Sequence, residues 1–405
     1  MQEEAFVARH FKEFYSNADV SVPSISQREF GVGDFGKKIS RRHLSFQSDS
    51  DLNFYLKQEA PLFISYSLAY YEHPERTPMA AKGFDGADIV YEFDADDLKT
   101  ECKQRHDNWV CVKCGEKGNG ALDNCPKCGS HAKVEQWFCP ECLDATKDQM
   151  FTLIKFLEND LQLNKGLSIN FSGNAGYHLH LRSDAVKDLS HSARLELLDY
   201  LTASSLELSS LGFYESSKAF LCPLEKDAKG WGKRILSMLS KLFEEGNAEK
   251  IAVLGGISNA KSKELVSNKD LVLKTMHEKG ILFSIPGRGN KKFWESLISN
   301  LVASNALDID RQTSADIRKI IRVPETLHGG TGLLASTIPL QKFKEFNPLK
   351  ETAVFNGGGV KVFINKSPKF YVGGEWFGPF NEEETELPLN AAIYLIAKKR
   401  AELVG

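Results

Sequence analysis

Residues 87–97 read ADIVYEFDADD, and the rest of the chain is interpreted outward from this stretch. Successive side chains of a strand point to opposite faces, so the pattern predicts a strand with Tyr91 and Phe93 on its apolar face. Asp94 and Asp96 then stand side by side on the other face, at the strand's end. Two carboxylates this close repel each other unless a cation or a proton lies between them, and oxygen ligands suit Mg²⁺ or Mn²⁺. The stretch is therefore a candidate metal site, with a polar strand end running into a turn as the simpler alternative.

Length and composition indicate a globular protein of two or three structural units. The chain has 405 residues, of which 42% are hydrophobic, and a formal net charge of -3. This charge gives no global basic field for nucleic acid, although a local basic groove is compatible with it. The start, MQEEAFVARHF, lacks an apolar signal core, and no run reaches the roughly 18 apolar residues of a membrane span. We therefore expect a cytoplasmic protein with no membrane segment.

The cysteines predict zinc. Seven of the eight lie within residues 102–142, and six of these form three Cys-x-x-Cys pairs. In a reducing compartment such spacing indicates metal binding rather than disulfides. The seven cysteines and His106 supply eight ligands, which is enough for two tetrahedral sites. We assign one site to Cys111, Cys114, Cys125 and Cys128, and the other to Cys102, His106, Cys139 and Cys142.

Two alternatives to this zinc assignment stay open. One is a single zinc ion with spare cysteines, and the other pairs Cys111 and Cys114 with Cys139 and Cys142. In each case four protein ligands leave no open coordination position, so the zinc is expected to be structural.

A second candidate site lies in residues 166–184, which predict a strand, a tight loop and another strand. The loop, residues 172–176 (SGNAG), offers a hydroxyl and backbone amides to phosphate oxygens. The second strand places His178, His180 and Arg182 on one face. A plain hairpin with a polar outer face is the alternative.

Residues 186–300 show helical spacing of apolar side chains and predict a mainly helical insertion. Lys229, Lys233 and Arg234, around Trp231, are candidates for contact with a nucleic-acid backbone. A solvated helix face is the simpler interpretation of such a charge cluster.

The last dense stretch contains Arg322 and His328, and the glycine-rich run 329–332 (GGTG) follows directly. Glycines there allow backbone, histidine and arginine to converge on an anion. After it, the tail predicts strands near residues 360–372 and a closing helix over residues 389–403.

Three motifs in this order resemble the catalytic motifs of the archaeo-eukaryotic primases, and above all those of the small, catalytic subunits of archaeal DNA primases. They are Asp94-Ala-Asp96, the run from Ser172 to His178, and the run from Arg322 through His328 to the glycines. The stretches 28–30, 42–46, 70–74 and 386–388 are similar to that family as well, so the resemblance covers nearly the whole chain.

The resemblance implies an α/β (α+β) fold: a primase catalytic core with a helical subdomain and an inserted zinc-binding subdomain. We expect the core in residues 1–190 and 301–405, the zinc-binding segment in residues 102–142, and the helical subdomain in residues 191–300.

It also implies the roles of single residues. Asp94, Asp96 and Asp310 are expected to hold two catalytic Mg²⁺ or Mn²⁺ ions, with Asp308 as the fallback for the third ligand. The expected nucleotide-binding residues are Ser172, Gly173, Gly176, His178, Arg322 and His328, with Glu29 and Arg42 lining the same pocket from the N-terminal side.

The sequence departs from the family pattern in two places. Asn174-Ala175 stands where relatives often carry a basic residue, and Lys38 or Arg182 is the candidate to compensate. The set Cys102, His106, Cys139 and Cys142 matches the family's single zinc knuckle, so the other four cysteines form an insertion within it.

The activity implied is that of a DNA primase, a component of the primosome in DNA replication. It makes short RNA, and in some cases DNA, primers from nucleoside triphosphates on single-stranded DNA, together with a large subunit. One alternative is a primase-like repair polymerase that only extends existing primers. Another is a non-enzymatic zinc-ribbon protein that binds nucleic acid, which leaves the ordered motifs unexplained.

Overall fold

The computed structural model describes residues 2–216, 219–283, 290–309 and 314–404. The chain forms two compact units. The core unit consists of Met1–Phe151, Lys165–Leu195 and Asp308–Gly405, and the helical unit consists of Thr152–Asn164 and Glu196–Leu307. The mixture of helices and strands confirms the predicted α+β class.

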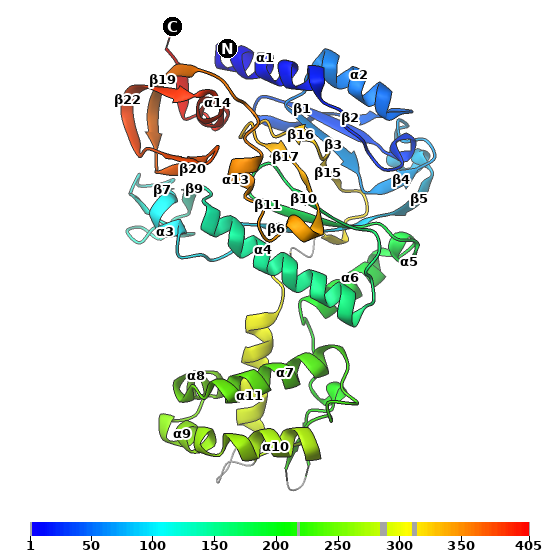
Figure 1. Cartoon of the computed structure of the whole chain (residues 1–405), viewed down its shortest axis with the longest axis vertical. Coiled ribbons are helices and arrows are strands. Elements are labelled where there is room, and N and C mark those ends of the chain that lie inside the picture. The colour runs from blue at the N-terminus through cyan, green and yellow to red at the C-terminus, as the bar shows by residue number, and fades with distance from the viewer. Residues whose placement is uncertain (1, 217–218, 284–289, 310–313, 405) are drawn as a thin grey trace. The chain divides into compact units, whose positions relative to one another are not determined.

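Two four-stranded antiparallel sheets form the centre of the core unit (Figure 1). The first has the order β15-β3-β1-β2 and the second the order β18-β10-β11-β6. Their bounds are Ile320–Arg322 (β15), Phe63–Ser67 (β3), Phe30–Asp34 (β1), Lys37–Leu44 (β2), Thr337–Ile338 (β18), Leu167–Phe171 (β10), Gly176–Leu181 (β11) and Ile89–Asp94 (β6). Every residue of β3 and β11 is buried, including the polar residues Ser65, Ser67, His178 and His180, so β11 has no solvent-exposed polar face.

Helices cover these sheets, and Figure 1 shows two of them, α1 and α2, side by side over the first sheet. Helix α1 buries Val7, Phe11 and Tyr15, which are spaced four residues apart and so lie on one face. Ser48 caps α2 because its hydroxyl accepts the backbone N–H of Asp51. The core-unit helices are Gln2–Asn17 (α1), Asp49–Glu59 (α2), Lys103–His106 (α3), Pro140–Lys155 (α4, which ends in the helical unit), Asp184–Lys187 (α5), Pro348–Glu351 (α13) and Leu389–Ala397 (α14).

Small sheets complete the core unit. The zinc-binding segment has the order β8-β7-β9, and the C-terminal sheet has the order β22-β19-β23. The strands are Ala69–Tyr71 (β4), Phe84–Ala87 (β5), Asn108–Cys111 (β7), Lys117–Asn119 (β8), Ala132–Glu135 (β9), Thr326–Leu327 (β16), Leu334–Ala335 (β17), Gly359–Ser367 (β19), Phe370–Val372 (β20), Glu375–Phe377 (β21), Phe380–Pro388 (β22) and Ala401–Leu403 (β23). The prediction of one closing helix to residue 403 is wrong, because α14 ends at Ala397 and the chain turns back to pair β23 with β19.

The helical unit packs its helices around buried tryptophans. Helix α7 turns Trp231, Ile235 and Leu239 inward, and Trp294 of α11 is fully buried. A small sheet, β12-β13-β14, is an element that helical spacing does not predict. The elements are His191–Leu201 (α6, which begins in the core unit), Tyr214–Glu215 (β12), Phe220–Leu221 (β13), Gly230–Glu245 (α7), Ala248–Gly255 (α8), Asn259–Ser267 (α9), Lys269–Lys279 (α10), Ile281–Leu282 (β14) and Asn290–Asn305 (α11). Over the described ranges, no helix is both long and apolar enough to cross a membrane.

Candidate active site and metal centres

The pairing of β6 with β11 brings the first two motifs together. Gly176 lies opposite Asp94, and His178 lies opposite Glu92. A side chain at Gly176 would collide with the carbonyl oxygen of Phe93 and stand 2.6 Å from Asp94 Oδ1. Only glycine therefore allows this loop to approach the aspartate.

The third motif packs against the loop between β10 and β11. The hydroxyl of Thr331 donates to the carbonyl oxygen of Gly173 at 2.6 Å. Gly173 has a φ of +78°, and a Cβ there would stand 2.8 Å from the Cβ of His328. Ser172 shapes the same loop, since its Oγ accepts the backbone N–H groups of Asn174 and Gly176 at 3.3 and 3.2 Å. The structure thus brings the three motifs into one place.

These motifs surround a cavity of about 260 Å³, called here the active-site cavity. Its lining is mostly polar and draws on both central sheets. The lining residues are Lys38, Ile39, Ser65, Glu92, Asp94, Ser172, Asn174, His178, Ile320, Ile321, Arg322 and His328.

The carboxylates of this site repel each other. Burial, reinforced by the negative charges of Asp96 and Glu92, raises the pKa of Asp94 to about 7. Asp96 Oδ1 is buried and has no hydrogen-bond partner in the described part of the chain. Orphaned, crowded carboxylate oxygens are what a divalent cation would satisfy, so this pair fits Mg²⁺ or Mn²⁺.

The position of Asp96 differs from the prediction. Strand β6 ends at Asp94, and the next residues form a turn in which the N–H of Asp97 donates to the carbonyl oxygen of Asp94 at 3.2 Å. Asp96 therefore lies in a turn and not on a strand face. The last bond toward β11 is from the N–H of Ala95 to the carbonyl oxygen of Ala175, at 2.9 Å, and Asp96 is absent from the described lining of the active-site cavity.

Asp310, the predicted third carboxylate ligand, lies outside the described residues. The fallback, Asp308, is exposed, and its backbone N–H lies 3.5 Å from the side-chain oxygen of Gln149. Asp308 is absent from the described lining of the active-site cavity.

Arg322 is a half-buried cation whose buried donors are unused. Its Nε and Nη1 are buried without a hydrogen-bond partner in the ranges described, and its guanidinium lies 4.9 Å from the ring centre of Phe63. Burial lowers the pKa of Arg322 to about 10, so the group stays charged at neutral pH. A charged group with two orphaned donors at a cavity indicates an anionic ligand.

Both histidines of the cavity are neutral donors. Burial lowers the pKa of His178 to about 4 and that of His328 well below its usual range. Nδ1 of His328 accepts the N–H of Gly330 at 3.2 Å, so the neutral ring carries its proton on Nε2. Nε2 of His178 lies 3.4 Å from a carboxylate oxygen of Glu92.

The cavity also contains residues that the motifs did not single out. Lys38 lines it, whereas Arg182 is engaged elsewhere: its guanidinium donates to the Tyr66 hydroxyl at 2.8 Å. Of the two candidates to compensate for Asn174-Ala175, Lys38 is thus the one at the cavity. Glu92 forms an ion pair with Lys319, and its other carboxylate oxygen faces the neutral ring of His178. The period of two in the 87–97 stretch could have identified Glu92, since it shares the face of Asp94.

Glu29 and Arg42 lie together but not on the described cavity wall. Arg42 Nε donates to Glu29 Oε1 at 2.9 Å, and His43 and Lys82 approach the same carboxylate at 3.3 and 3.5 Å. Glu29 is fully buried, so the structure places it as the centre of an ion cluster.

The first metal centre groups Cys102, His106, Cys139 and Cys142, all buried. The Cys102 and Cys139 sulfurs lie 3.3 and 3.7 Å from that of Cys142, and Nε2 of His106 lies 3.2 Å from it. A tetrahedron with zinc–sulfur bonds of about 2.3 Å has edges of about 3.8 Å, so the set matches a zinc site. Nδ1 of His106 bonds to the Asp107 carboxylate at 2.8 Å, the usual partner of a zinc-binding histidine.

The second metal centre groups Cys111, Cys114, Cys125 and Cys128. Three sulfur pairs lie 3.5 to 3.7 Å apart, again close to a tetrahedral edge. The backbone N–H groups of Lys113 and Cys114 both donate to the Cys111 sulfur at 3.4 Å. The ligands therefore group as first assigned, and not with Cys111 and Cys114 paired to the last two cysteines.

One contact joins the first metal centre to the candidate active site. The ammonium group of Lys103, in α3, donates to the backbone carbonyl of Asp96 at 2.8 Å, and this lysine is buried. Cys102 begins that helix as its N-cap. The metal centre thereby supports the turn that carries the second aspartate.

Comparisons with known proteins find one family model and relatives that extend over nearly the whole chain. The model of the DNA primase small subunit family matches residues 133–338, about half of the chain. The DNA primase small subunit PriS of Methanothrix thermoacetophila is 30% identical, over 98% of this chain and 98% of the relative. The proteins of the same name from Cenarchaeum symbiosum and Nitrosopumilus maritimus are each 27% identical, over 97% and 99% of this chain and 96% and 97% of those relatives.

Proposed function

The chain belongs to the family of DNA primase small subunits, and from this premise we propose that it synthesises short primers on single-stranded DNA by nucleotidyl transfer. In this reaction a 3′-hydroxyl attacks the α-phosphate of a nucleoside triphosphate and pyrophosphate leaves. RNA primers are the expected product, with DNA primers as a second possibility that the assay below separates.

The observation that carries the proposal is that one cavity is lined by a carboxylate that favours a cation and by a guanidinium that favours an anion. Asp94 lines the cavity and is crowded by the charge of its neighbour Asp96, and Arg322 lines the same cavity with two buried donors that have no partner in the described ranges. A nucleoside triphosphate with its divalent ions supplies both at once.

Asp94 and Asp96 would hold the divalent ions, with Asp310 as the proposed third ligand and Asp308 as its fallback. When bound, Mg²⁺ or Mn²⁺ supplies Lewis-acid stabilisation of the phosphate oxygens and activates the attacking hydroxyl.

The remaining lining would hold the triphosphate. Arg322 can grip phosphate oxygens with its two unused donors, and His328 offers its Nε2–H. His178 and the Ser172 hydroxyl add neutral donors, and Lys38 adds a second cation. Gly173 and Gly176 contribute through the close approach of their backbone to the other motifs.

Glu29 and Arg42 would support the cavity without lining it. We propose that their ion pair fixes the edge of the first sheet, from which Lys38 reaches the cavity.

Zinc in the two metal centres would be structural, and a large subunit would be the partner of this small subunit. Neither zinc ion would take part in the transfer, because all four coordination positions are filled by the protein.

A synthesis assay tests this proposal. The full chain, with and without a large subunit, is given single-stranded DNA, Mg²⁺ or Mn²⁺ and labelled ribonucleotides or deoxyribonucleotides, beside Asp94→Asn. Unprimed product that disappears in Asp94→Asn is the expected result. Extension of a supplied primer with no unprimed product under any condition would instead identify a primase-like repair polymerase.

A further inference from the structure

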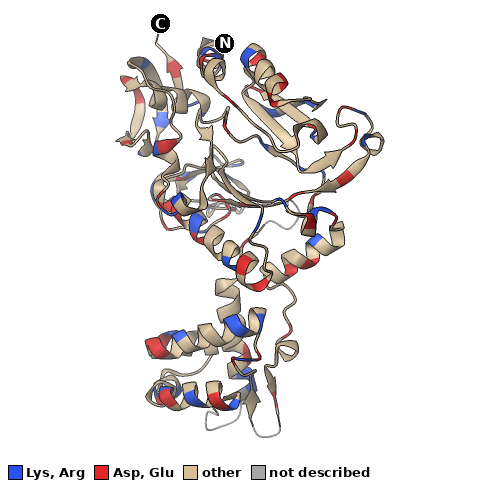
Figure 2. Cartoon of the chain, turned by 45° about the vertical axis from the view of Figure 1, so that its right-hand side comes forward, with Lys and Arg blue, Asp and Glu red and all other residues tan. Residues whose placement is uncertain are grey.

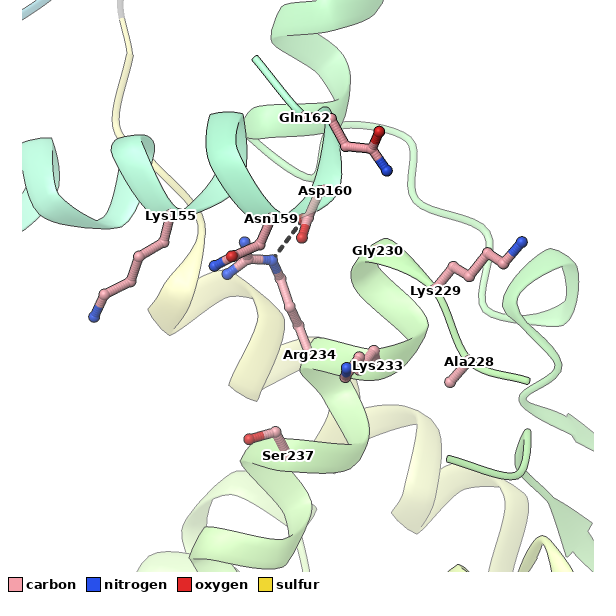
Figure 3. A pocket seen from close by; sticks show the side chains of 10 residues that line it. All are labelled: Lys155, Asn159, Asp160, Gln162, Ala228, Lys229, Gly230, Lys233, Arg234 and Ser237. Carbon is pink, nitrogen blue, oxygen red and sulfur yellow. Dashed lines mark hydrogen bonds and ion pairs between the residues drawn. The ribbon is translucent and has the colours of Figure 1, made fainter. Parts of the chain in front are cut away.

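The helical unit contains a second polar cavity, of about 770 Å³, whose lining is dominated by basic side chains (Figure 3). It is built entirely from residues of this unit. The lining residues are Lys155, Asn159, Asp160, Gln162, Ala228, Lys229, Gly230, Lys233, Arg234 and Ser237. We call it the basic cavity.

One guanidinium is held in place at the wall of the basic cavity. Arg234 Nε donates to the Asp160 carboxylate at 2.7 Å (Figure 3). The guanidinium of Arg234 also lies 3.5 Å from the ring centre of Phe156. The Tyr200 hydroxyl donates to the same Asp160 oxygen at 2.9 Å. The Asp160 carboxylate therefore accepts only the Nε–H of Arg234. The two terminal amino groups of Arg234 have no hydrogen-bond partner in the described ranges.

The backbone beneath this contact is unusual. Helix α4 continues into a π-helical turn over Phe156–Asp160, a rare geometry that is frequent at functional sites. The turn supplies Asn159 and Asp160 to the wall.

The lysines of the basic cavity are uncompensated. Lys155, Lys229 and Lys233 are exposed and form no ion pair with a described residue. With Arg234 they give four positive charges against the single carboxylate of Asp160. Figure 2 shows Lys and Arg mixed with Asp and Glu elsewhere on the helices of this unit, so this excess is local. Like charges gathered without partners favour a polyanionic ligand.

The lining selects phosphate groups and not bases. The aromatic rings of Phe156 and Trp231 are buried behind the wall, and the Trp231 indole donates to the carbonyl oxygen of Tyr200 at 2.6 Å. No aromatic residue is on the described wall, and Ala228 is its one apolar side chain there. A site for a free nucleotide needs a surface for the base, whereas a strand of nucleic acid can be held through its backbone alone.

We propose that the basic cavity binds the backbone phosphates of single-stranded nucleic acid. That the strand is template DNA rests on the proposed function; the phosphate site itself rests on the cavity. Arg234 grips one phosphate with its terminal amino groups, and the three lysines neutralise its neighbours.

The salt dependence of DNA binding tests this proposal. The affinity of the full chain for a fluorescent single-stranded oligonucleotide is measured by anisotropy over a series of salt concentrations. Each phosphate neutralised on a single strand contributes about 0.7 to the slope of log affinity against log salt. The triple variant Lys155→Gln/Lys229→Gln/Lys233→Gln is expected to reduce that slope by about 2.

A matched triple variant controls for total charge. Lys241, Lys263 and Lys274 are exposed lysines of the same unit outside the basic cavity. Their replacement by Gln removes the same charge and is expected to leave the slope close to that of the unchanged chain. Equal slopes for the two triple variants would overturn the proposal, as would tripolyphosphate binding that the cavity variant abolishes while DNA binding stays unchanged.

The experiments distinguish a failure of this proposal from a failure of the proposed function. If the chain makes no primers but the cavity variant still reduces the salt dependence of DNA binding, the phosphate site is supported and the proposed function is wrong. If the chain makes primers and the cavity variant shows the same salt dependence of DNA binding as the unchanged chain, only the proposed phosphate site is wrong.

Discussion

At the scale of single residues, the candidate active site contains buried polar atoms without hydrogen-bond partners in the described part of the chain. Arg322, on the cavity wall, has two such donors, and Asp96, beside the cavity residue Asp94, has one such oxygen. Leaving such groups unsatisfied costs stability, and they are retained where a ligand completes them. Residues of this kind give direct predictions.

Arg322→Gln should weaken triphosphate binding without destabilising the fold. A charge-assisted hydrogen bond contributes about 1.5–3 kcal/mol, so the KM for the nucleotide should rise roughly 10- to 150-fold. The melting temperature should stay the same or rise, because an unpaired buried charge is removed. Steady-state kinetics and thermal melting check both. A KM equal to that of the unchanged chain would contradict the assigned role.

The raised pKa of Asp94 predicts how the metal-free protein responds to pH. The native pKa of about 7 lies above the ordinary value of 3.8, so the native state binds a proton more tightly than the unfolded state does. The stability from this carboxyl is therefore complete below about pH 4 and is lost as the pH rises through about 7. Chemical unfolding in chelator should show this loss, and Asp94→Asn should lack it. An identical pH dependence in both proteins would count against the burial argument.

At the scale of elements, the cavity depends on strand pairing and on one lysine that joins two parts of the core unit. β6 and β11 set Asp94 opposite Gly176, and α3 supports the Asp96 turn through Lys103. Strand alternation and the glycine loop were predictable from the sequence because both follow from local geometry. The turn at Asp96 and the displacement of Glu29 and Arg42 from the cavity wall depend on where partner strands end and on long-range ion pairs, which local patterns do not encode.

Lys103→Met should slow primer synthesis while zinc stays bound. Without the bond to the Asp96 carbonyl, the turn loses a fixed position, and small misplacements at an active site reduce rates severely. We expect a loss of about tenfold or more in kcat, with unchanged zinc content by mass spectrometry. Lys133→Met, at an exposed lysine of the same zinc-binding segment, is the matched control. Equal rates for the two variants would mean that the contact does not position Asp96.

At the scale of the whole molecule, the ordered motifs predicted the family and the α+β class, and the cysteine spacing predicted two ligand clusters that could hold zinc, since both are properties of the sequence itself. The small sheet of the helical unit and its π-helical turn were not predictable, because short strands and helix irregularities depend on packing. The basic cavity was predictable in part. Lys229, Lys233 and Arg234 are neighbours in the sequence and were candidates for nucleic-acid contact, whereas Lys155 lies more than 70 residues before them and only folding brings it to the same wall.

The two metal centres predict two zinc ions per chain. Native mass spectrometry of the full chain should show both. Cys125→Ser should remove one ion and leave the core unit folded, because that centre has its own small core of Trp109, Cys111, Cys125 and Ala132. One zinc ion in the unchanged chain would return the assignment to a single site with spare cysteines.

The most direct test of the central claim is a crystal structure of the full chain with Mn²⁺ and a non-hydrolysable nucleoside triphosphate. The account predicts an anomalous manganese peak bound by Asp94 and Asp96, with triphosphate oxygens on Arg322 and His328. Manganese absent from the aspartates, or a triphosphate bound outside the active-site cavity, would contradict it.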